Sequence, residues 1–358
     1  MNVAIISTCA LPTPPRAYGG TELVAAELAH GLTELGHDVV VYATGDSAPH
    51  GRLRWIEPRP VWPPNEAAEA RHARFAFDDL AAHTSDVVHV QDSAALPFHR
   101  DVGAPCVLTL HHRRDDRILQ SCMRFPEVAF VAISRRQAEL HRELPVARVI
   151  HHGVDPSRYP FGPGDGGYVA FLGRFAPEKA PHLAMDAALR AEVPLRLGGD
   201  AHAVARRYFE QEVAPRLSRH ARELQWLGEL AHDPKVELLR GARALLMPLE
   251  WEEPFGLVMI EAMLVGTPVL AFPRGSAPEV VDEGVTGCLV RDVAEMAQRI
   301  RAVDAIDRGR CRRRAAERFS YLRMARDHVA LYEELIARSP RGRRSRPSLA
   351  GAPNARTL

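Results

Sequence analysis

Short apolar runs alternate with helical patterns along almost the whole chain, and this alternation constrains the fold more than any other feature. The runs of the first half begin at Val3, Val39, Val87, Cys106, Val128 and Val149, and those of the second half at Tyr168, Leu195, Leu224, Ala244 and Pro268. Strands that alternate with helices are typical of parallel sheets covered on both faces. The sequence therefore predicts an α/β fold built from doubly wound parallel sheets.

The segment between the first two runs predicts a helix most clearly. Thr21 is placed to cap it, Leu28 and Leu32 belong to an apolar stripe, and Gly36 can close it. The segment from His50 to Asp78, by contrast, shows no regular pattern, and we expect an irregular structure there.

A Gly- and Pro-rich stretch, FGPGDGG at 161–167, interrupts the alternation before it restarts. We therefore expect one domain at 1–160 and a second at 166–320, with a cleft between them. The residues at 319–338 follow a helical pattern, and those at 339–358 are rich in Arg, Pro and Ser, which is typical of a disordered basic tail. Such a tail can touch an anionic membrane, but we favour a solvated tail.

Composition excludes several classes of function. The 358 residues have a formal net charge of +1, which gives no field suited to nucleic acid. The five cysteines are scattered without paired spacing, which argues against a disulfide framework and a zinc site. The chain opens with the strand-like NVAIIST, and no apolar run is long enough to span a membrane. We expect a cytoplasmic protein, and peripheral contact at the inner membrane face stays open.

Two glutamates stand out in the second half. Glu253 precedes a Phe-Gly-Leu turn, and Glu261 lies in the apolar helix that follows it. The start of that helix, near Phe255, Gly256 and Leu257, offers backbone N–H groups and a positive dipole end to an anion such as a diphosphate. The alternative is that Glu261 is a structural acid bonded to a neighbouring loop.

Two cations follow the run YVAFL. Gly173 ends that run, and Arg174 and Lys179 lie in the loop at the carboxyl end of the expected strand, where open α/β sheets bind ligands. Arg offers a planar fork to phosphate oxygens and Lys a point charge. Two cations this close repel unless an anion lies between them. The alternative is a pair of solvated surface charges.

Further glycines and a histidine also follow expected strands. Gly199 and Gly228 follow two strands of the second half, and Gly19 and Gly20 precede a helix start in the first. Each permits close approach of a backbone to a ligand, although for a single glycine taken alone we favour an ordinary turn at a strand end. His111 follows the run CVLTL and is expected to project from its carboxyl end into the cleft.

Several motifs occur in one order along the chain: YGGTE at 18–22, HHGVD at 151–155, GRFAPEK at 173–179, the two glutamates with seven residues between them, EAMLVGTPV at 261–269 and GSAPEVV at 275–281. In this set and its order the chain resembles glycosyltransferase family 4, from about Asn2 to Leu335. It departs from the family at Ser276, where a second Gly is usual, and at Gln91, where His is commoner.

The resemblance implies the GT-B fold: two Rossmann-like domains that face a cleft, with a C-terminal helix, 322–338, crossing back to the first, acceptor-binding domain. The resemblance implies a retaining enzyme of the hexosyltransferase type that uses neither a metal nor a cofactor. Such an enzyme moves a sugar from a nucleoside-diphosphate sugar to a hydroxyl of a glycan, lipid or natural product. The catalytic residues it implies are Glu253, His111, Arg174 and Lys179. The donor-binding residues it implies are Gly19, Gly20, Gly173, Gly199, Gly228, Phe255, Gly256, Leu257 and Glu261.

Other functions fit the sequence less well. A non-catalytic, nucleotide-binding partner of a glycosyltransferase is the main alternative. An oxidoreductase ranks last because no G-x-G-x-x-G follows the first strand. We expect no metal site, since no Asp-x-Asp strand end is present and adjacent histidines on a strand point to opposite faces. The donor sugar, its base, the acceptor and the oligomeric state stay open.

Overall fold

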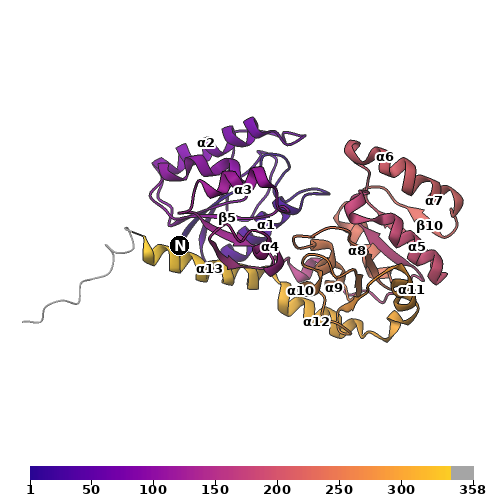
Figure 1. Ribbon diagram of the computed structural model, residues 1–358. Coiled ribbons are helices and arrows are strands. Elements are labelled where there is room, and N and C mark those ends of the chain that lie inside the picture. Colours follow the sequence, from indigo (N-terminus) through magenta and orange to yellow (C-terminus); the bar gives the residue numbers. More distant parts are fainter. Residues whose placement is uncertain (340–358) are drawn as a thin grey trace, which may run out of the picture.

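Two fully parallel sheets organise residues 1–339, which are the residues that the computed structural model describes (Figure 1). The first sheet has seven strands in the order β3-β2-β1-β4-β5-β6-β7, and the second has six in the order β10-β9-β8-β11-β12-β13. This confirms the predicted fold class. The predicted basic tail lies outside the described residues, apart from Ser339.

The strands are short and their side chains are mostly buried, as expected for sheets covered on both faces. Those of the first sheet are β1 (Asn2–Ile6), β2 (Asp38–Tyr42), β3 (Arg52–Arg54), β4 (Val87–Val90), β5 (Cys106–Thr109), β6 (Ala129–Ala132) and β7 (Val146–Val149). Those of the second are β8 (Val169–Leu172), β9 (Leu195–Gly198), β10 (Leu224–Trp226), β11 (Leu245–Met247), β12 (Val269–Ala271) and β13 (Gly287–Leu289).

Helices connect the strands. The first half contains α1 (Gly20–Glu34), α2 (Glu66–Ala82), α3 (Asp116–Met123), α4 (Arg135–Leu140) and the 3₁₀ segments η1 (Ser93–Asp101) and η2 (Pro156–Arg158). The second half contains α5 (Pro181–Ala191), α6 (Arg206–Tyr208), α7 (Ala214–Arg219), α8 (His232–Gly241), α9 (Leu257–Leu264), α10 (Ala277–Val280), α11 (Val293–Ala302), α12 (Arg308–Phe319), α13 (Tyr321–Arg338), the 3₁₀ segments η3 (Pro177–Lys179), η4 (Ala203–Ala205) and η6 (Val303–Ala305), and the π-helical η5 (Phe209–Val213).

Two local predictions were wrong. The segment from His50 to Asp78 is not irregular, because it holds β3 and most of α2. Asn65 caps α2 by accepting hydrogen bonds from the N–H groups of Ala67 and Ala68. Thr21 does not cap α1, since the cap position is Gly19 and Thr21 lies in the first turn.

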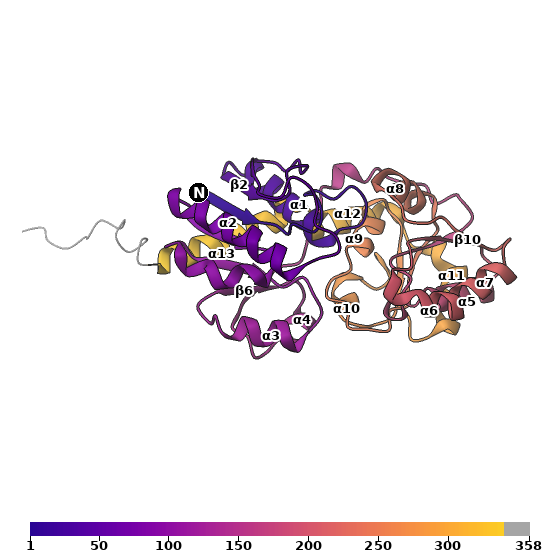
Figure 2. The ribbon, with the colours of Figure 1, turned by 90° about the horizontal axis from the view of Figure 1, so that it is seen from above.

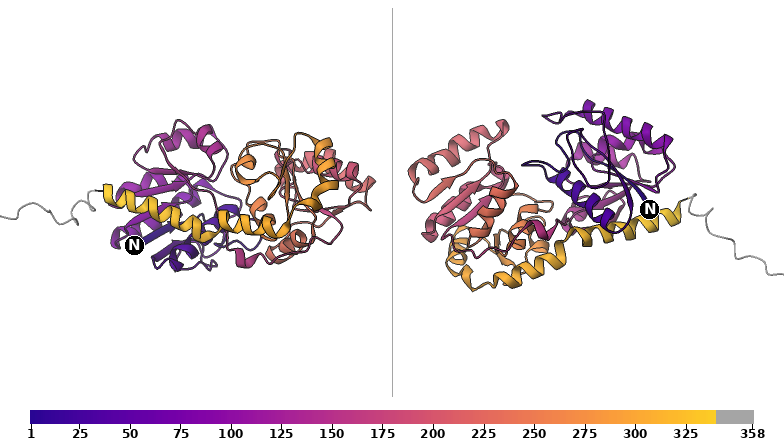
Figure 3. Two further views of the ribbon diagram at one scale, coloured as in Figure 1. Left: turned by 90° about the horizontal axis from the view of Figure 1, so that it is seen from below. Right: turned by 180° about the vertical axis from the view of Figure 1, so that it is seen from behind.

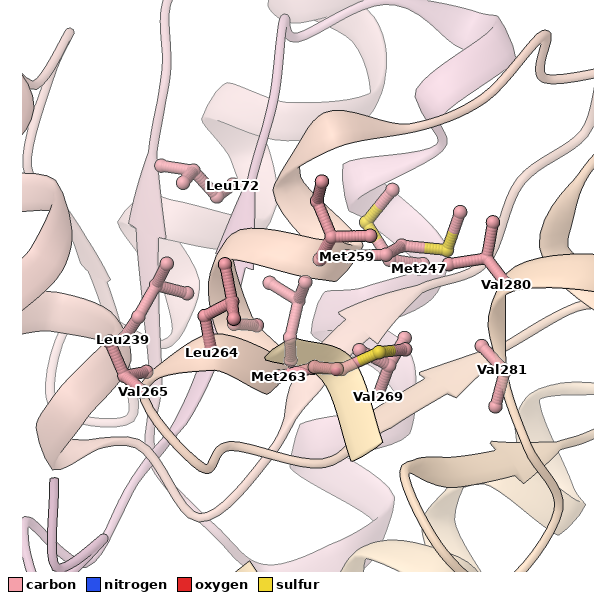
Figure 4. Close-up of a cluster of buried hydrophobic side chains, with 14 of the residues drawn as sticks. Leu172, Leu239, Met247, Met259, Met263, Leu264, Val265, Val269, Val280 and Val281 are labelled. Carbon is pink, nitrogen blue, oxygen red and sulfur yellow. The ribbon is translucent and has the colours of Figure 1, made fainter. Parts of the chain in front are cut away.

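The core of the second half surrounds α9 (Figure 4). Met259 and Met263 of α9 pack with Met247 of β11 and Val269 of β12, and all four side chains are at most 1% exposed. Because α9 is apolar on nearly all sides, it is buried between the sheet and α12. The loop before α9 is thereby fixed at one end.

The last helix, α13, lies against the first half of the molecule, whereas α12 stays with the second (Figure 3). Met324, Leu331 and Tyr332 of α13 join the core cluster of Val24 and Leu28 from α1. The view from above shows the two halves side by side with α13 beneath the first (Figure 2). The predicted crossing helix is thus confirmed, while the exact limits of the two domains stay a prediction.

The strand order reverses once in each sheet. β1 has β2 on one side and β4 on the other, and β8 has β9 on one side and β11 on the other. Parallel α/β sheets bind ligands outside the carboxyl ends of strands at such switch points. Each half therefore presents a binding edge.

Candidate active site

A cavity of about 680 Å³ lies between the two halves and is lined by residues from both. This volume is in the range of small-molecule sites. Its walls include loops that follow β1, β5, β8, β9 and β11, so it occupies the binding edges of both sheets. The predicted residues that line it are Gly19, Gly20, His111, Gly173, Arg174, Lys179, Gly199, Glu253, Phe255, Gly256, Leu257 and Glu261.

Gly228 is the one predicted residue that does not line this cavity among residues 1–339, although Glu229 and Leu230 beside it do. Its carbonyl oxygen accepts a hydrogen bond of 2.8 Å from the N–H of Gly199. A Cβ atom on Gly199 would lie 1.9 Å from the carbonyl oxygen of Gly173. The loops after β8, β9 and β10 thus pack backbone against backbone, which explains glycine at Gly199.

Two helix N-termini meet at the cavity. α1 starts after Gly19 and α9 after Gly256, and no described side chain caps either helix. A Cβ atom on Gly20 would lie 3.5 Å from Leu257, so the two helix starts are neighbours across the cleft. Uncapped N–H groups and the positive ends of two dipoles favour an anion at this place.

The two predicted cations each have a carboxylate partner. Arg174 Nη2 lies 3.3 Å from Glu178 Oε1. Lys179 donates to Glu253 Oε2, and its Nζ atom lies 4.7 Å from the centre of the Trp251 ring. The repulsion between the two cations is therefore offset by carboxylates of the protein itself.

Glu253 is buried, with 6% of its surface exposed, but only one of its carboxylate oxygens is engaged. Oε2 accepts from Lys179 and, at 2.9 Å, from the indole N–H of Trp251. No residue among 1–339 hydrogen-bonds Oε1, and the residue lines the cavity. Oε1 is thus available to a ligand.

Glu261 is held in the same manner. Its Oε1 accepts from Lys235 of α8 and from the hydroxyl of Tyr159, which lies 3.0 Å away. Burial, and then the charge of Glu261, hold the pKa of Tyr159 well above its usual value, so the hydroxyl remains a donor. Glu261 is 3% exposed and lines the cavity together with Lys235.

His111 is a neutral imidazole in this site. Burial, and then the neighbouring His112 and His328, lower the pKa of His111 to about 3. Its Nε2 lies 2.7 Å from Gln91 Oε1, so Nε2–H donates and Nδ1 carries the free lone pair. Gln91, which is one of the positions at which the chain departs from the family pattern, therefore orients His111.

The adjacent histidine pairs do not assemble a metal site. The ring of His152 stacks on His111 at 5.3 Å, while His151 Nε2 lies 3.2 Å from Glu279. Within the described part of the chain, no group of three or more His, Cys, Asp or Glu side chains is placed to hold a metal ion. All five cysteines are buried and free.

Three residues of the site were not predicted from the sequence: Trp251, Lys235 and Tyr159. Each belongs to no sequence motif and is part of the site because it contacts Glu253 or Glu261. Trp251 lies two residues before Glu253, so its closeness in the sequence could have indicated the contact. Lys235 and Tyr159 reach Glu261 over 26 and 102 residues, and no spacing rule indicates such contacts.

No helix within residues 1–339 combines the length and the apolar character that crossing a bilayer requires.

Two family models match the chain in succession. Glycosyltransferase Family 4 matches residues 18–158, and Glycosyl transferases group 1 matches residues 166–303. The first match covers β2 to β7 and the second covers β8 to β13, while β1, α12 and α13 lie outside both.

Curated relatives match part of the chain. A glycogen synthase of Mycobacterium tuberculosis is 34% identical over 169 residues, which are 43% of this chain and 39% of the relative. A D-inositol 3-phosphate glycosyltransferase of Mycobacterium bovis is 32% identical over 206 residues, which are 52% of this chain and 42% of the relative. The chain therefore spans about two fifths of the length of these relatives.

Solved structures match nearly the whole chain. AviGT4, a glycosyltransferase involved in avilamycin A biosynthesis, has a TM-score of 0.71 at 25% identity and covers 94% of this chain and 98% of its own. The Anabaena protein HepE in complex with UDP-glucose has a TM-score of 0.74 at 20% identity, covering 94% of this chain and 100% of its own. With both family models and the two facing sheets in agreement, the chain belongs to glycosyltransferase family 4 and has the GT-B fold.

Proposed function

We propose that this protein transfers a hexose from a nucleoside-diphosphate sugar to an acceptor hydroxyl, with retention of anomeric configuration and without a divalent metal. One observation supports this above all. A single cavity gathers two cations, two uncapped helix N-termini and two carboxylates, Glu253 and Glu261, and in each carboxylate one oxygen has no hydrogen-bond partner among residues 1–339. The cations and helix N-termini complement the anionic diphosphate of a nucleotide sugar, and the carboxylates can accept hydrogen bonds from its sugar and ribose hydroxyls.

The diphosphate end of the donor needs positive charge, since negative charge grows on the leaving oxygen in the transition state. Arg174, Lys179 and the N–H groups at the start of α9 line the cavity and supply it. They are held in place before the ligand arrives, which is the condition for electrostatic catalysis. A chain that provides these donors itself has less need of a metal ion.

The sugar and ribose ends need hydroxyl acceptors. We assign the free oxygen of Glu253 to the donor sugar and that of Glu261 to the ribose hydroxyls. His111, on the opposite wall, offers a neutral ring close to the reacting sugar. We take UDP-hexose as the first donor to test, because HepE, which has the same fold, is described in complex with UDP-glucose. The acceptor class remains a glycan, a lipid or a natural product.

The test combines binding and turnover. The full chain is titrated with UDP, GDP, UDP-glucose, GDP-mannose and the bare nucleosides, and products formed with a panel of acceptors are identified by mass spectrometry. If a sugar nucleotide binds but no sugar is transferred and no nucleoside diphosphate is released, the result would favour the non-catalytic partner instead. Turnover that disappears in excess chelator and returns with magnesium or manganese would contradict metal independence.

Arg174→Ala tests the placement of the diphosphate. Its partner Glu178 is partly exposed, so the substitution leaves no deeply buried charge behind. We expect the affinity for UDP to fall about 10- to 100-fold while that for uridine is unchanged. Arg206→Ala is the control, since Arg206 pairs with Glu210 on the outside of the second half and does not line the cavity. Equal losses for UDP and uridine would contradict the placement.

A further inference from the structure

Trp251 contacts both charged groups at the sugar end of the cavity. Its indole N–H donates to Glu253 Oε2 at 2.9 Å, and its ring lies 4.7 Å from Lys179 Nζ. It lines the cavity itself and is only partly buried. One side chain thus touches the carboxylate through its edge and the ammonium group through its face.

The backbone of Glu253 is fixed from the other side. Ser276 N–H donates to the Glu253 carbonyl oxygen at 2.8 Å, and the Ser276 hydroxyl donates to the Phe255 carbonyl oxygen at 2.6 Å. These bonds fix the position of the main chain, but they do not fix the orientation of the Glu253 carboxylate. That orientation depends on the two groups that bind Oε2, namely Lys179 and Trp251.

A carboxylate beside a lone ammonium group can place either oxygen, or both, against the cation, because Lys is a point charge with rotatable donors. The indole N–H is a single donor in a rigid plane. With Trp251 present, Lys179 and the indole share Oε2, and Oε1 is left without a partner among the described residues. The stacked ring also favours the present position of the ammonium group.

We propose that Trp251 is a positioning residue for sugar transfer: it fixes Lys179 and Oε2 of Glu253 so that Oε1 remains open to the donor sugar. The inference rests on the proposed function for its consequence, but the contact itself can be tested without turnover. Trp251 belongs to none of the sequence motifs described above.

The first test is spectroscopic. The chain has four tryptophans, so the indole N–H region of a ¹⁵N-labelled sample contains four signals, which Trp→Phe variants assign. We expect the Trp251 signal to move when Glu253→Gln removes the charge of its acceptor, and to stay in place in Glu178→Gln, which alters a neighbouring carboxylate bonded to Arg174. A Trp251 signal that is the same in Glu253→Gln and the parent overturns the inference.

The second test separates positioning from support of the fold. Trp251→Phe keeps a ring over Lys179 and removes the N–H donor, whereas Trp251→Leu removes both. We expect kcat with the donor found above to fall about ten-fold in Trp251→Phe and further in Trp251→Leu, with the Kd for UDP within about two-fold of the parent. Trp62→Phe is the control, since Trp62 is 55% exposed and does not line the cavity.

The outcomes are distinguishable. An unchanged kcat in Trp251→Phe, or a loss of UDP affinity and melting temperature in parallel with kcat, overturns the positioning role. Absence of turnover in the parent with every donor is a failure of the proposed function instead, and the indole signals still decide whether Trp251 holds Glu253.

Discussion

At the scale of single residues, the two glutamates have the same kind of environment and different positions. Each has one oxygen bound by a lysine and by a second donor, which is the Trp251 indole for Glu253 and the Tyr159 hydroxyl for Glu261. Glu253 precedes α9, whereas Glu261 is its fifth residue. The two carboxylates therefore line the cavity at different places, one before α9 and one within it.

Substitution of each glutamate by glutamine separates their roles. Glu253→Gln is expected to lower kcat by about 10- to 100-fold with little change in the Kd for UDP, because it removes charge at the sugar end. Glu261→Gln is expected to weaken UDP about 10-fold or more, because a neutral amide accepts hydroxyl hydrogen bonds less strongly. Steady-state kinetics and calorimetric titration of both variants beside the parent measure the two effects. A Glu253→Gln variant with the parental kcat would mean that the motif is structural.

The sequence indicates the charged groups of the site but not what holds them. Arg174, Lys179 and Glu253 lie in loops that follow strands, and Glu261 lies in the helix after Glu253. Elementary rules for α/β sheets therefore place all four at one edge. The contact of Lys235 with Glu261 depends on how α8 and α9 pack on the sheet. The pairing of Lys179 with Glu253 likewise depends on the adjacency of β8 and β11. Such contacts follow from tertiary structure, which local patterns do not encode.

At the scale of elements, the loop before α9 depends on the loop after β12. Gly275 has φ +57°, and a Cβ atom there would lie 2.2 Å from the backbone nitrogen of Glu253 and 2.3 Å from its carbonyl oxygen. No side chain fits without moving Glu253. The glycine is therefore required by a close approach of two backbones as well as by its conformation.

Gly275→Ala is expected to lower kcat and to destabilise the fold by more than the roughly 1–2 kcal/mol that a left-handed alanine costs. Gly284→Ala is the matched control, since Gly284 has φ +71° and no atom within 4 Å of its added Cβ. Both variants bear the conformational cost, and only the first displaces Glu253. Chemical denaturation and donor turnover compare them, and equal behaviour of the two variants would refute the close approach.

Two buried histidines lie where the crossing helix α13 packs on the first half: His328 of α13 and His89 of β4. His328 Nδ1–H donates to the Met324 carbonyl oxygen, while its Nε2 is buried without a partner among residues 1–339. Its ring lies 5.1 Å from that of His89, which bonds the Tyr332 hydroxyl. Burial, before any neighbouring charge, lowers the pKa of His328 to about 4.

This lowered pKa predicts a loss of stability in acid. Below pH 6.5, the usual pKa of histidine, His328 becomes protonated in the unfolded chain. In the folded chain it stays neutral down to about pH 4. The free energy of unfolding should thus fall by about 2 kcal/mol between pH 7.5 and pH 5 from this residue alone. Burial raises the pKa values of Glu27 and Glu69 to about 7, which acts in the opposite sense, so the parent must be compared with a variant.

His328→Phe keeps a ring and removes the titration. Urea unfolding at pH 7.5 and pH 5 should show a pH-dependent loss smaller by about 2 kcal/mol than in the parent. An identical pH dependence of both proteins would show that His328 is not excluded from water in the folded state.

The pattern of side chains explains which elements the sequence revealed. The helix α1 was evident because Leu28 and Leu32 form an apolar stripe, whereas α2 was overlooked because its buried face mixes small alanines with the polar Glu69 and His72. Alanine contributes little to a hydrophobic period, although it packs well. The edge strand β3 has only three residues, two of them Arg, and thus lacks the apolar run of an inner strand.

At the scale of the whole molecule, one carboxylate of the second half binds the first half at three points. Glu279 accepts from the backbone N–H groups of Arg135 and Arg136 at 2.8 Å each and lies 3.2 Å from His151 Nε2. Burial opposes its ionisation, but these hydrogen bonds hold the pKa of Glu279 below its usual value. Glu252, beside Glu253, adds an ion pair of 2.9 Å with Arg136.

Glu279→Ala is expected to loosen the two halves, because it leaves two backbone donors and a histidine without their acceptor. The loss is about 1–3 kcal/mol of interaction between the halves. Small-angle X-ray scattering should show a larger radius of gyration than the parent without ligand, and a larger contraction on addition of UDP. Glu317→Ala, which removes an exposed acid of α12, should behave like the parent. A parental radius of gyration in Glu279→Ala would mean that other contacts close the cleft.

The chain passes between the halves twice, and the two passages are joined by main-chain hydrogen bonds. Val154 N–H donates to the Phe319 carbonyl oxygen at 3.0 Å, and Tyr321 N–H donates to that of Val154 at 3.1 Å. The segment from 155 to 319 therefore leaves and re-enters the first half at almost one point. Because the ends of this segment are adjacent, evolution can exchange it for the matching segment of a relative without changing the path of the rest of the chain. Under the proposed function, such an exchange would combine one acceptor-binding half with halves that bind different sugar nucleotides.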